Sequence, residues 1–185
     1  MAVEEAKYTV LEKQDKLEIR EYAPSIVAEV LVEGDFENAS SAAFRTLFKY
    51  ISGKNTGRSK IAMTAPVSQK PAPEKIAMTS PVGQRKSGQG WAVSFMMPAS
   101  YTMETIPVPD DPSVVLREVP AYRAAAIRYS GTWSEKGYRR QLTQLRQWME
   151  TQNLEPAGEP VWARYNAPFT PWFMRRNEIL IAIGS

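Results

Sequence analysis

Alternating apolar and polar positions mark the first elements of the chain. Residues 7–13 (KYTVLEK), 16–22 (KLEIREY) and 25–33 (SIVAEVLVE) are rich in β-branched residues and partly alternate. Gln14-Asp15 and Ala23-Pro24 separate them. The pattern predicts three consecutive strands.

The spacing of apolar residues changes after Gly34-Asp35. Phe44, Leu47, Phe48 and Ile51 follow an i, i+3, i+4, i+7 pattern, which is typical of one apolar side of a helix. We expect this helix to end near Gly53 and its apolar residues to pack mainly in a core.

The second half of the chain repeats this order of elements. Strands are predicted at 91–97, 113–119, 122–130, 161–166 and 177–183, and a helix with Tyr138, Leu142, Leu145, Trp148 and Met149 on one side. Thr132 and Glu135 have the spacing of a capping box at the start of that helix. Residues 167–174 (APFTPWFM) form an aromatic corner between the last two strands.

A constant offset relates the two halves. Arg20-Glu21 precedes Gly34 by the same interval that separates Arg117-Glu118 from Gly131, and the two motifs lie 97 residues apart. We interpret this as an internal duplication within one domain of residues 1–185, with pseudo-repeats at about 8–97 and 113–183. The expected fold is α+β and internally duplicated: two helices pack on one curved, largely antiparallel sheet, with a groove near the pseudo-axis.

An octapeptide occurs twice, as KIAMTAPV at 60–67 and KIAMTSPV at 75–82. Proline is the seventh residue of each copy. It favours two strands near a sheet edge, joined as a hairpin with an Ile and a Met of each copy facing the core. Met63 and Met78 could ligate copper or haem iron as thioethers, but gap-filling core methionines are the favoured interpretation.

Composition excludes several classes of function. The net charge is +3 and the basic residues are scattered, so no nucleic-acid surface is expected. No window is apolar enough for a membrane span, and the N-terminus has no signal-peptide pattern. We therefore expect a cytoplasmic protein, or a periplasmic one if a signal peptide has been removed.

The chain contains no Cys and no His. This excludes thiol nucleophiles, catalytic triads that use His, structural zinc sites and His-ligated haem. Candidate acid/base groups are Tyr22, Tyr129, Tyr165 and Glu178, which form no recognisable motif. An enzyme is not expected.

Several motifs together resemble the SOUL family of haem-binding proteins. They are LEIREY, FRTLFKYISGKN at 44–55, the MTAPV and MTSPV phrases, RYSGTW at 128–133, Trp162 and Tyr165, and RRNEILIAI at 175–183. The resemblance implies a distorted antiparallel barrel with two helices and reversible, non-catalytic binding of haem or another tetrapyrrole. The doubled phrase is more like bacterial and plant members than animal ones.

The resemblance also implies a site, an apolar cleft between the first helix and the aromatic corner. Its residues here are Phe44, Phe48, Lys49, Phe169 and Thr170. Similar proteins carry Met at the three Phe positions and Lys at Thr170, so one partner for a haem propionate is missing. Lys49 could still pair with a propionate, and Arg175 or Arg176 could replace the missing charge. The axial His proposed for another branch has no counterpart.

Other interpretations remain open for these residues and for the function. Lys49 could be a solvated side chain, and Arg175-Arg176-Asn177-Glu178 could form a structural ion pair. The alternative function is an effector-sensing or protein-interaction module that binds other amphipathic molecules in the same groove. Solvent exposure of Phe169, Trp172 and Phe173 would favour a ligand or partner.

Overall fold

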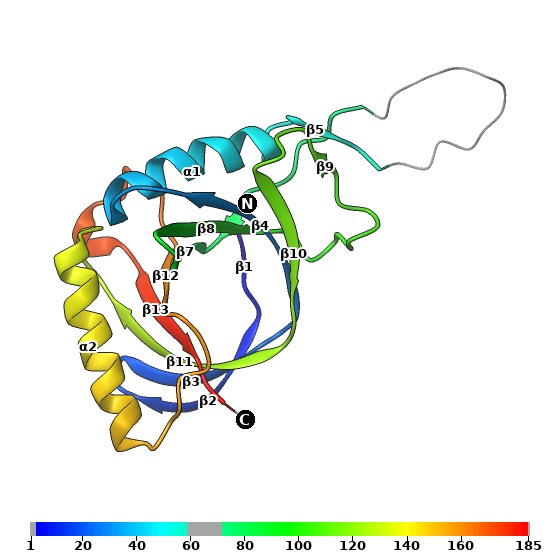
Figure 1. The fold of residues 1–185 in the computed structure, drawn as a ribbon. Coiled ribbons are helices and arrows are strands. Elements are labelled where there is room, and N and C mark those ends of the chain that lie inside the picture. Colours follow the sequence, from blue (N-terminus) through cyan, green and yellow to red (C-terminus); the bar gives the residue numbers. More distant parts are fainter. Residues whose placement is uncertain (1–2, 59–71, 185) are drawn as a thin grey trace, which may run out of the picture.

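A nine-stranded antiparallel sheet curls into a half-barrel in the computed structural model, which describes residues 3–58 and 72–184 (Figure 1). The strand order is β10-β4-β8-β7-β12-β13-β11-β3-β2. These strands are β2 (Tyr8–Gln14), β3 (Leu17–Tyr22), β4 (Ser25–Val32), β7 (Val82–Ser87), β8 (Gly90–Met96), β10 (Val114–Val119), β11 (Tyr122–Tyr129), β12 (Val161–Arg164) and β13 (Asn177–Ala182).

Two helices and several short elements complete the described chain. The helices are α1 (Phe36–Ile51) and α2 (Glu135–Thr151), and a 3-10 turn, η1, covers Trp172–Met174. Strand β1 (Glu4–Glu5) pairs in parallel with β6 (Thr79–Ser80), and β5 (Asn55–Thr56) pairs with β9 (Val108–Pro109). Neither α1 nor α2 has the length and apolar composition that a membrane span requires.

The strand order confirms the internal duplication. Strands β3 and β10 begin and end 97 residues apart, and so do β4 and β11. The order is symmetric about the boundary between β7 and β12, because β8 and β13, then β4 and β11, then β10 and β3 follow outward on the two sides.

The two halves are interleaved. Strand β3 pairs with β11 of the second half, and β10 pairs with β4 of the first half. The short corner Ala23-Pro24 connects β3 to β4, and Pro120-Ala121 connects β10 to β11, across the opening of the curled sheet. Each half therefore completes its sheet only with a strand from the other.

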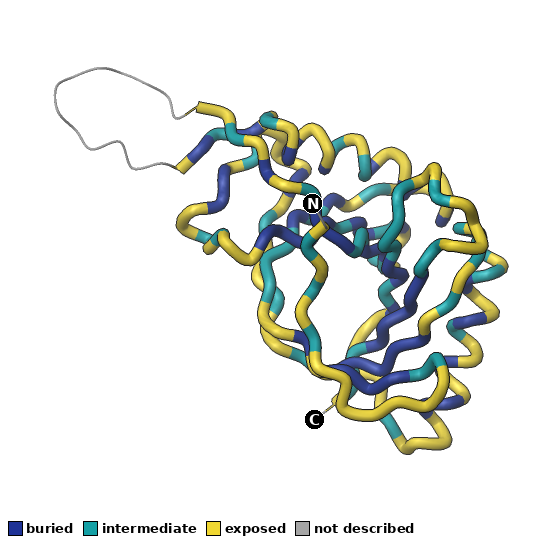
Figure 2. Tube along the Cα trace, turned by 180° about the vertical axis from the view of Figure 1, so that it is seen from behind, coloured by how far each residue is buried: buried dark blue, intermediate teal, exposed yellow. Residues whose placement is uncertain are grey.

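Both helices cover the convex face of the sheet (Figure 1). Helix α1 packs on β4 and β8, and α2 packs on β11 and β13. Alternate strand residues such as Ala28, Val93 and Ile179 point to the helices and are fully buried, since successive side chains of a strand face opposite sides. Figure 2 shows buried positions along the strands and exposed positions on the outer sides of the helices.

The buried side of α1 differs from the predicted one. Leu47 and Ile51 are buried as expected, together with Ala43 and Tyr50, but Phe48 is 50% exposed. At 3.6 residues per turn, Phe48 is rotated about 100° from the buried Leu47, away from the side of α1 that packs on the sheet. Core packing, one of the two interpretations of Phe48, is therefore wrong, and its predicted role in ligand binding stays a prediction.

The start of α2 also differs from the prediction. Ser134 is the N-cap and its Oγ accepts a hydrogen bond from the backbone N–H of Gly137. Thr132 does not cap the helix. The two halves lose their 97-residue offset here because α2 begins 99 residues after α1.

The second octapeptide copy is mostly irregular rather than a strand. Within this copy only Thr79–Ser80, in β6, and Val82, the first residue of β7, belong to strands. Strand β6 pairs with β1. Ile76 is buried and Met78 is partly buried in the core beneath α1, as expected for this copy. The first copy, including Met63, lies outside the described residues, and so does the predicted register between the copies.

Candidate functional site

The aromatic corner, residues 167–174, projects apolar side chains into solvent. Phe169 is 90% exposed, and Trp172, Phe173 and Met174 are also exposed. Trp172 and Phe173 meet edge to face, with their ring centroids 5.6 Å apart. Prolines at 168 and 171 restrict the backbone, so this turn presents its rings outward at low cost in conformational entropy.

Arg175 holds the corner in shape. Its Nε donates to the carbonyl of Thr170 and its Nη2 to the carbonyl of Pro168, both at 2.8 Å. The guanidinium lies over the ring of Trp133, 4.3 Å from the centroid. Among the described residues no carboxylate pairs with Arg175, so its charge remains beside the exposed rings. Thr170 is half-buried and contributes its backbone.

The predicted residues of α1 form a second aromatic surface. Phe44 is half-buried with its ring against the edge of Phe95, and Phe48 stacks on Phe44 with centroids 6.0 Å apart. Lys49 is exposed beside them. Hydrogen bonds from Ser113, and to a lesser degree the charge of Lys49, lower the pKa of Asp111.

Among the residues that the structure describes, no interaction connects the aromatic corner with the aromatic surface of α1. Within residues 3–58 and 72–184, no hydrogen bond, ion pair or ring contact connects Phe44, Phe48 or Lys49 with the aromatic corner. The corner is tied instead to the loop before α2, where the Gly131 N–H donates to the Trp172 carbonyl. A single cleft formed by both surfaces therefore stays a prediction.

Arg176 belongs to a buried charge network on the concave face. Its Nε donates to Glu178 Oε1 at 3.0 Å and its Nη1 to Glu5 Oε2 at 2.8 Å. Arg20 donates to both oxygens of the same Glu178 from Nη1 and Nη2. This is the structural ion pair that the sequence left as an alternative, and a ligand contact for Arg176 stays a prediction.

The same network contains three of the four candidate acid/base groups, Glu178, Tyr165 and Tyr22. Tyr165 donates its hydroxyl to Glu178 Oε2 at 2.9 Å, and Tyr22 accepts a hydrogen bond from Arg20. Burial alone would raise the pKa of Glu178, but Arg20 and Arg176 lower it; burial raises the pKa of both tyrosines. None of the three therefore titrates near neutral pH, where general acid/base catalysis needs its groups.

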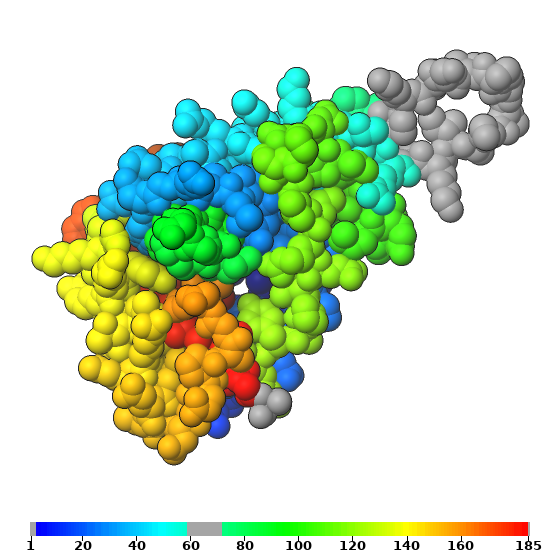
Figure 3. Space-filling view, viewed as in Figure 1, coloured from blue at the N-terminus to red at the C-terminus, as the bar shows by residue number. Residues whose placement is uncertain are grey.

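A hollow of about 1160 Å³ occupies the rest of the concave face. It runs from the two connecting corners, Ala23-Pro24 and Pro120-Ala121, across strands on both sides of the pseudo-axis. Figure 3 shows its mouth between the yellow-green residues of β10–β11 and the orange residues that follow α2. Its position near the pseudo-axis agrees with the groove expected from the duplication.

Sequence reasoning missed the residues that line this hollow. Glu29, Arg85 and Arg117 form an ion cluster in it, in which Arg85 Nη2 lies 2.9 Å from Glu29 Oε1 and Arg117 Nη2 lies 3.2 Å from Glu29 Oε2. The available signal was a carboxylate inside the otherwise apolar run 25–33. None of the seven residues predicted for ligand binding lines the hollow.

Solved structures share this fold at low sequence identity. A hydrolase from Listeria innocua aligns with a TM-score of 0.59 and 14% identity over 94% of each chain. The EcmrR C-terminal domain aligns with a TM-score of 0.59 and 13% identity, over 96% of this chain and 98% of that one. EcmrR in a complex with DNA aligns with a TM-score of 0.64 and 11% identity, over 91% of this chain and 57% of that one.

These likenesses establish the fold alone. No curated protein matches the chain in sequence. The model of one protein family, described as SOUL heme-binding protein, matches residues 3–182, which is nearly the whole chain. The strand order, the two helices on the convex face and this match lead to one conclusion: the chain belongs to the SOUL heme-binding protein family.

Proposed function

We propose that this protein binds haem or a related tetrapyrrole reversibly, as a carrier or buffer, without transforming it. One observation carries the proposal. The chain has 19 Phe, Trp and Tyr residues, all within the described part, and the exposed ones are Phe48, Phe169, Trp172 and Phe173. All four lie in the two segments that the family resemblance indicates.

A tetrapyrrole matches such surfaces physically. Its ring is broad, flat and apolar, and covering exposed aromatic faces with it removes apolar area from water on both partners. An exposed apolar cluster on an otherwise well-buried chain marks a binding surface. In the proposal Phe169, Trp172 and Phe173 contact the ring directly, and Phe44 supports Phe48 from below.

Two cations are placed to receive the acid arms of the tetrapyrrole. Arg175 lies at the corner and Lys49 beside Phe48, and neither belongs to an ion pair among the described residues. Among the described residues, the Nη1 group of Arg175 has no hydrogen-bond acceptor. Arg176, by contrast, is neutralised by Glu5 and Glu178, so the proposal assigns the propionates to Arg175 and Lys49.

Haem would supply an iron centre whose reactivity depends on its axial ligands. This chain has neither His nor Cys to provide them, which leaves Met and Tyr side chains as the possible axial ligands. Its side chains can cover the ring and pair with the acid arms. This favours a carrier role over a catalytic one.

Titration of the purified protein with hemin, followed by Soret absorbance, tests the proposal. We expect saturable binding that the double substitution Phe169→Ser/Trp172→Ser weakens tenfold or more, since central aromatic contacts typically contribute more than 1 kcal/mol each. Phe48→Asp and Lys49→Glu test whether α1 shares the site. The control is Leu31→Ser, which removes an exposed apolar side chain outside both segments.

The outcomes separate specific binding from adsorption. Loss of affinity in the corner variant with no change in Leu31→Ser supports the proposal. Equal affinity in all variants, or equal loss in the control, contradicts it. A bound porphyrin whose absorbance spectrum changes progressively with time contradicts the non-catalytic part.

A further inference from the structure

The concave hollow has the size and wall of a small-molecule site. Its volume of about 1160 Å³ is slightly larger than that of most ligand pockets, which typically measure about 300–1000 Å³. Its lining includes Val27, Met96, Val161 and Leu180, which give an apolar wall from four different strands.

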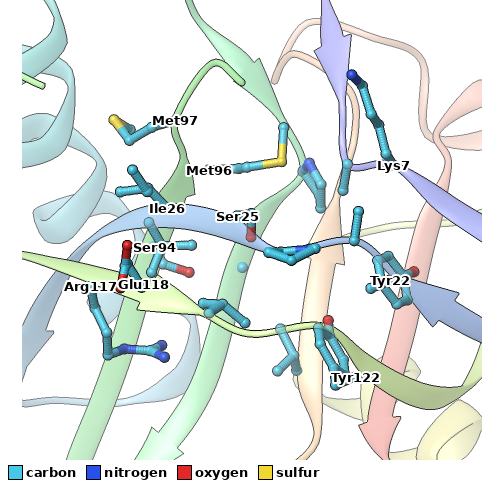
Figure 4. A pocket seen from close by; sticks show the side chains of 18 of the residues that line it. Lys7, Tyr22, Ser25, Ile26, Ser94, Met96, Met97, Arg117, Glu118 and Tyr122 are labelled. Carbon is cyan, nitrogen blue, oxygen red and sulfur yellow. The ribbon is translucent and has the colours of Figure 1, made fainter. Parts of the chain in front are cut away.

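Tyr122, which is partly exposed, forms one end of this wall, and the buried Tyr22 supports it. The rings of Tyr22 and Tyr122 stack with centroids 5.1 Å apart and an interplanar angle of 11°. Figure 4 shows these rings on one side of the pocket and Arg117 on the other, with Met96 and Ser25 between them. A molecule that lies across the hollow would contact the tyrosines at one end and the charged cluster at the other.

The charged cluster carries one positive charge in excess. Glu29 is largely buried and uses both carboxylate oxygens, one for Arg85 and one for Arg117. Each guanidinium donates one hydrogen bond to Glu29, from Nη2. Among the described residues, its other nitrogens have no acceptor. Both arginines are partly exposed, so these donors are available to a molecule in the hollow.

Guanidinium forks of this kind select carboxylates, because their parallel N–H groups match the two oxygens. A cation is a poorer fit, since it would have to displace an arginine from Glu29. Two other carboxylates in the lining are already engaged: Glu5 pairs with Arg176, and Glu4 accepts from the Ala99 N–H. Glu118 and Glu159 are exposed to solvent.

We infer that the concave hollow is a second ligand site, which binds a molecule with a flat apolar body and a terminal carboxylate. The carboxylate pairs with Arg85 and Arg117, and the apolar body lies along Met96 and Val161 toward Tyr22 and Tyr122. This site is separate from the proposed tetrapyrrole surface, because it shares none of that surface's residues.

Fluorescence titration with 1-pyrenebutyrate tests this inference. The matched probes are 1-pyrenebutanol, which lacks the charge, and 1-pyrenebutyltrimethylammonium, which reverses it. The variants are Arg85→Gln and Arg117→Gln, with Arg123→Gln as control, because Arg123 forms a similar exposed ion pair with Glu21 outside the hollow. Val27→Trp fills the hollow without changing its charge.

We expect pyrenebutyrate to bind at least tenfold more tightly than the alcohol. Arg85→Gln and Arg117→Gln should each weaken pyrenebutyrate binding tenfold or more, that is, by at least about 1.4 kcal/mol, because each removes a charged hydrogen bond. Binding of the alcohol should not change in these variants, and Arg123→Gln should change neither. Val27→Trp should weaken binding of both.

Three results would overturn the inference. They are equal affinity for the carboxylate and the alcohol, tighter binding of the ammonium probe, and an effect of Arg123→Gln equal to that of Arg117→Gln. The Phe169→Ser/Trp172→Ser variant distinguishes the two sites: it should weaken hemin binding and leave pyrenebutyrate binding unchanged. If Arg117→Gln weakens hemin binding and the corner variant does not, the corner proposal fails while the concave site stands.

Discussion

Arg20 and Arg117 occupy equivalent positions in the two halves and have different surroundings. Arg20 lies opposite Ala124 in β11, and Arg117 lies opposite Val27 in β4; each arginine and each partner is 97 residues from its counterpart. The Arg20 side chain is 1% exposed, whereas that of Arg117 is 45% exposed. Arg20 is buried in an ion network that supports the fold, whereas Arg117 faces the open hollow.

The strands beyond them explain the difference. Strand β3, which carries Arg20, is covered by β2, whereas β10, which carries Arg117, is the last strand at its edge. Tyr8 of β2 also covers the Arg20 guanidinium, 4.3 Å from its ring centroid. Duplication thus supplied two similar arginines, and one additional strand closed only one end of the concave face.

The largest expected effect is on stability. Removing one member of a buried ion network typically costs about 3–5 kcal/mol, because the remaining charges stay buried. Arg20→Met should therefore lower the free energy of unfolding by about that amount, whereas Arg117→Met should change it by less than about 1 kcal/mol. Urea denaturation at pH 7 measures both. Equal losses would show that the two ends of the concave face are energetically alike.

The second largest expected effect is a loss of stability at low pH, caused by the buried network of Glu178 with Arg20 and Arg176. Arg20 and Arg176 hold the pKa of Glu178 below its usual range despite burial. The resulting stabilisation is fully present when the pH is above the pKa of Glu178 in the unfolded chain, about 4.3. It is lost as the pH falls through the lower pKa that Glu178 has in the folded protein. The unfolding free energy of the wild type should decrease over that range, and Glu178→Gln should decrease less steeply.

The exposed pair of Arg123 and Glu21 provides the control for this pH dependence. Glu21→Gln removes a carboxylate that is 52% exposed. Its profile should match that of the wild type. A Glu178→Gln profile equal to the wild-type one would mean that Glu178 is not coupled to folding.

The helix caps provide a smaller contrast between the halves. Asp35 accepts hydrogen bonds from the N–H groups of Glu37 and Asn38, whereas Ser134 accepts one from Gly137. Loss of a cap typically costs about 1 kcal/mol. We expect Asp35→Ala to cost about that and Ser134→Ala somewhat less, measured by urea denaturation. The opposite order would show that cap strength does not follow the number of bonds.

The smallest expected effect is on ligand affinity at the cluster of Glu29, Arg85 and Arg117 in the hollow. Glu29→Gln removes the charge that engages Arg85 and Arg117 and should tighten binding of 1-pyrenebutyrate by roughly threefold, or about 0.65 kcal/mol. Binding of 1-pyrenebutanol should remain the same. Weaker binding of the carboxylate would mean that Glu29 orients the arginines rather than competing for them.

Much of the fold could be predicted from particular residues. The alternating runs at 16–22 and 25–33 became β3 and β4, and the repeated Arg-Glu and Gly spacing revealed the duplication. Strand β7 was missed beyond its first residue, because Gly83, Gln84 and Arg85 lack an apolar pattern. Gln84 is buried through a side-chain hydrogen bond to the carbonyl of Phe36, a long-range contact with no local signal.

The two candidate sites also differ in how far the sequence could predict them. Phe169, Trp172 and Phe173 are concentrated in a proline-bounded turn, so local sequence could single them out. Glu29, Arg85 and Arg117 come from three strands far apart in the chain. Their cluster depends on the sheet curling so that their side chains meet, which one sequence does not reveal.

The sequence by itself determined the order of elements, the doubled plan, the absence of imidazole and thiol, and the concentration of aromatic rings in one turn, because these depend on residue type and short spacing. Tertiary structure decided that those rings are exposed, which arginine is buried and which is exposed, and which side chains line the hollow. Those outcomes depend on which strands become neighbours and on the sheet edge that remains uncovered, since burial and charge pairing arise only from long-range contacts.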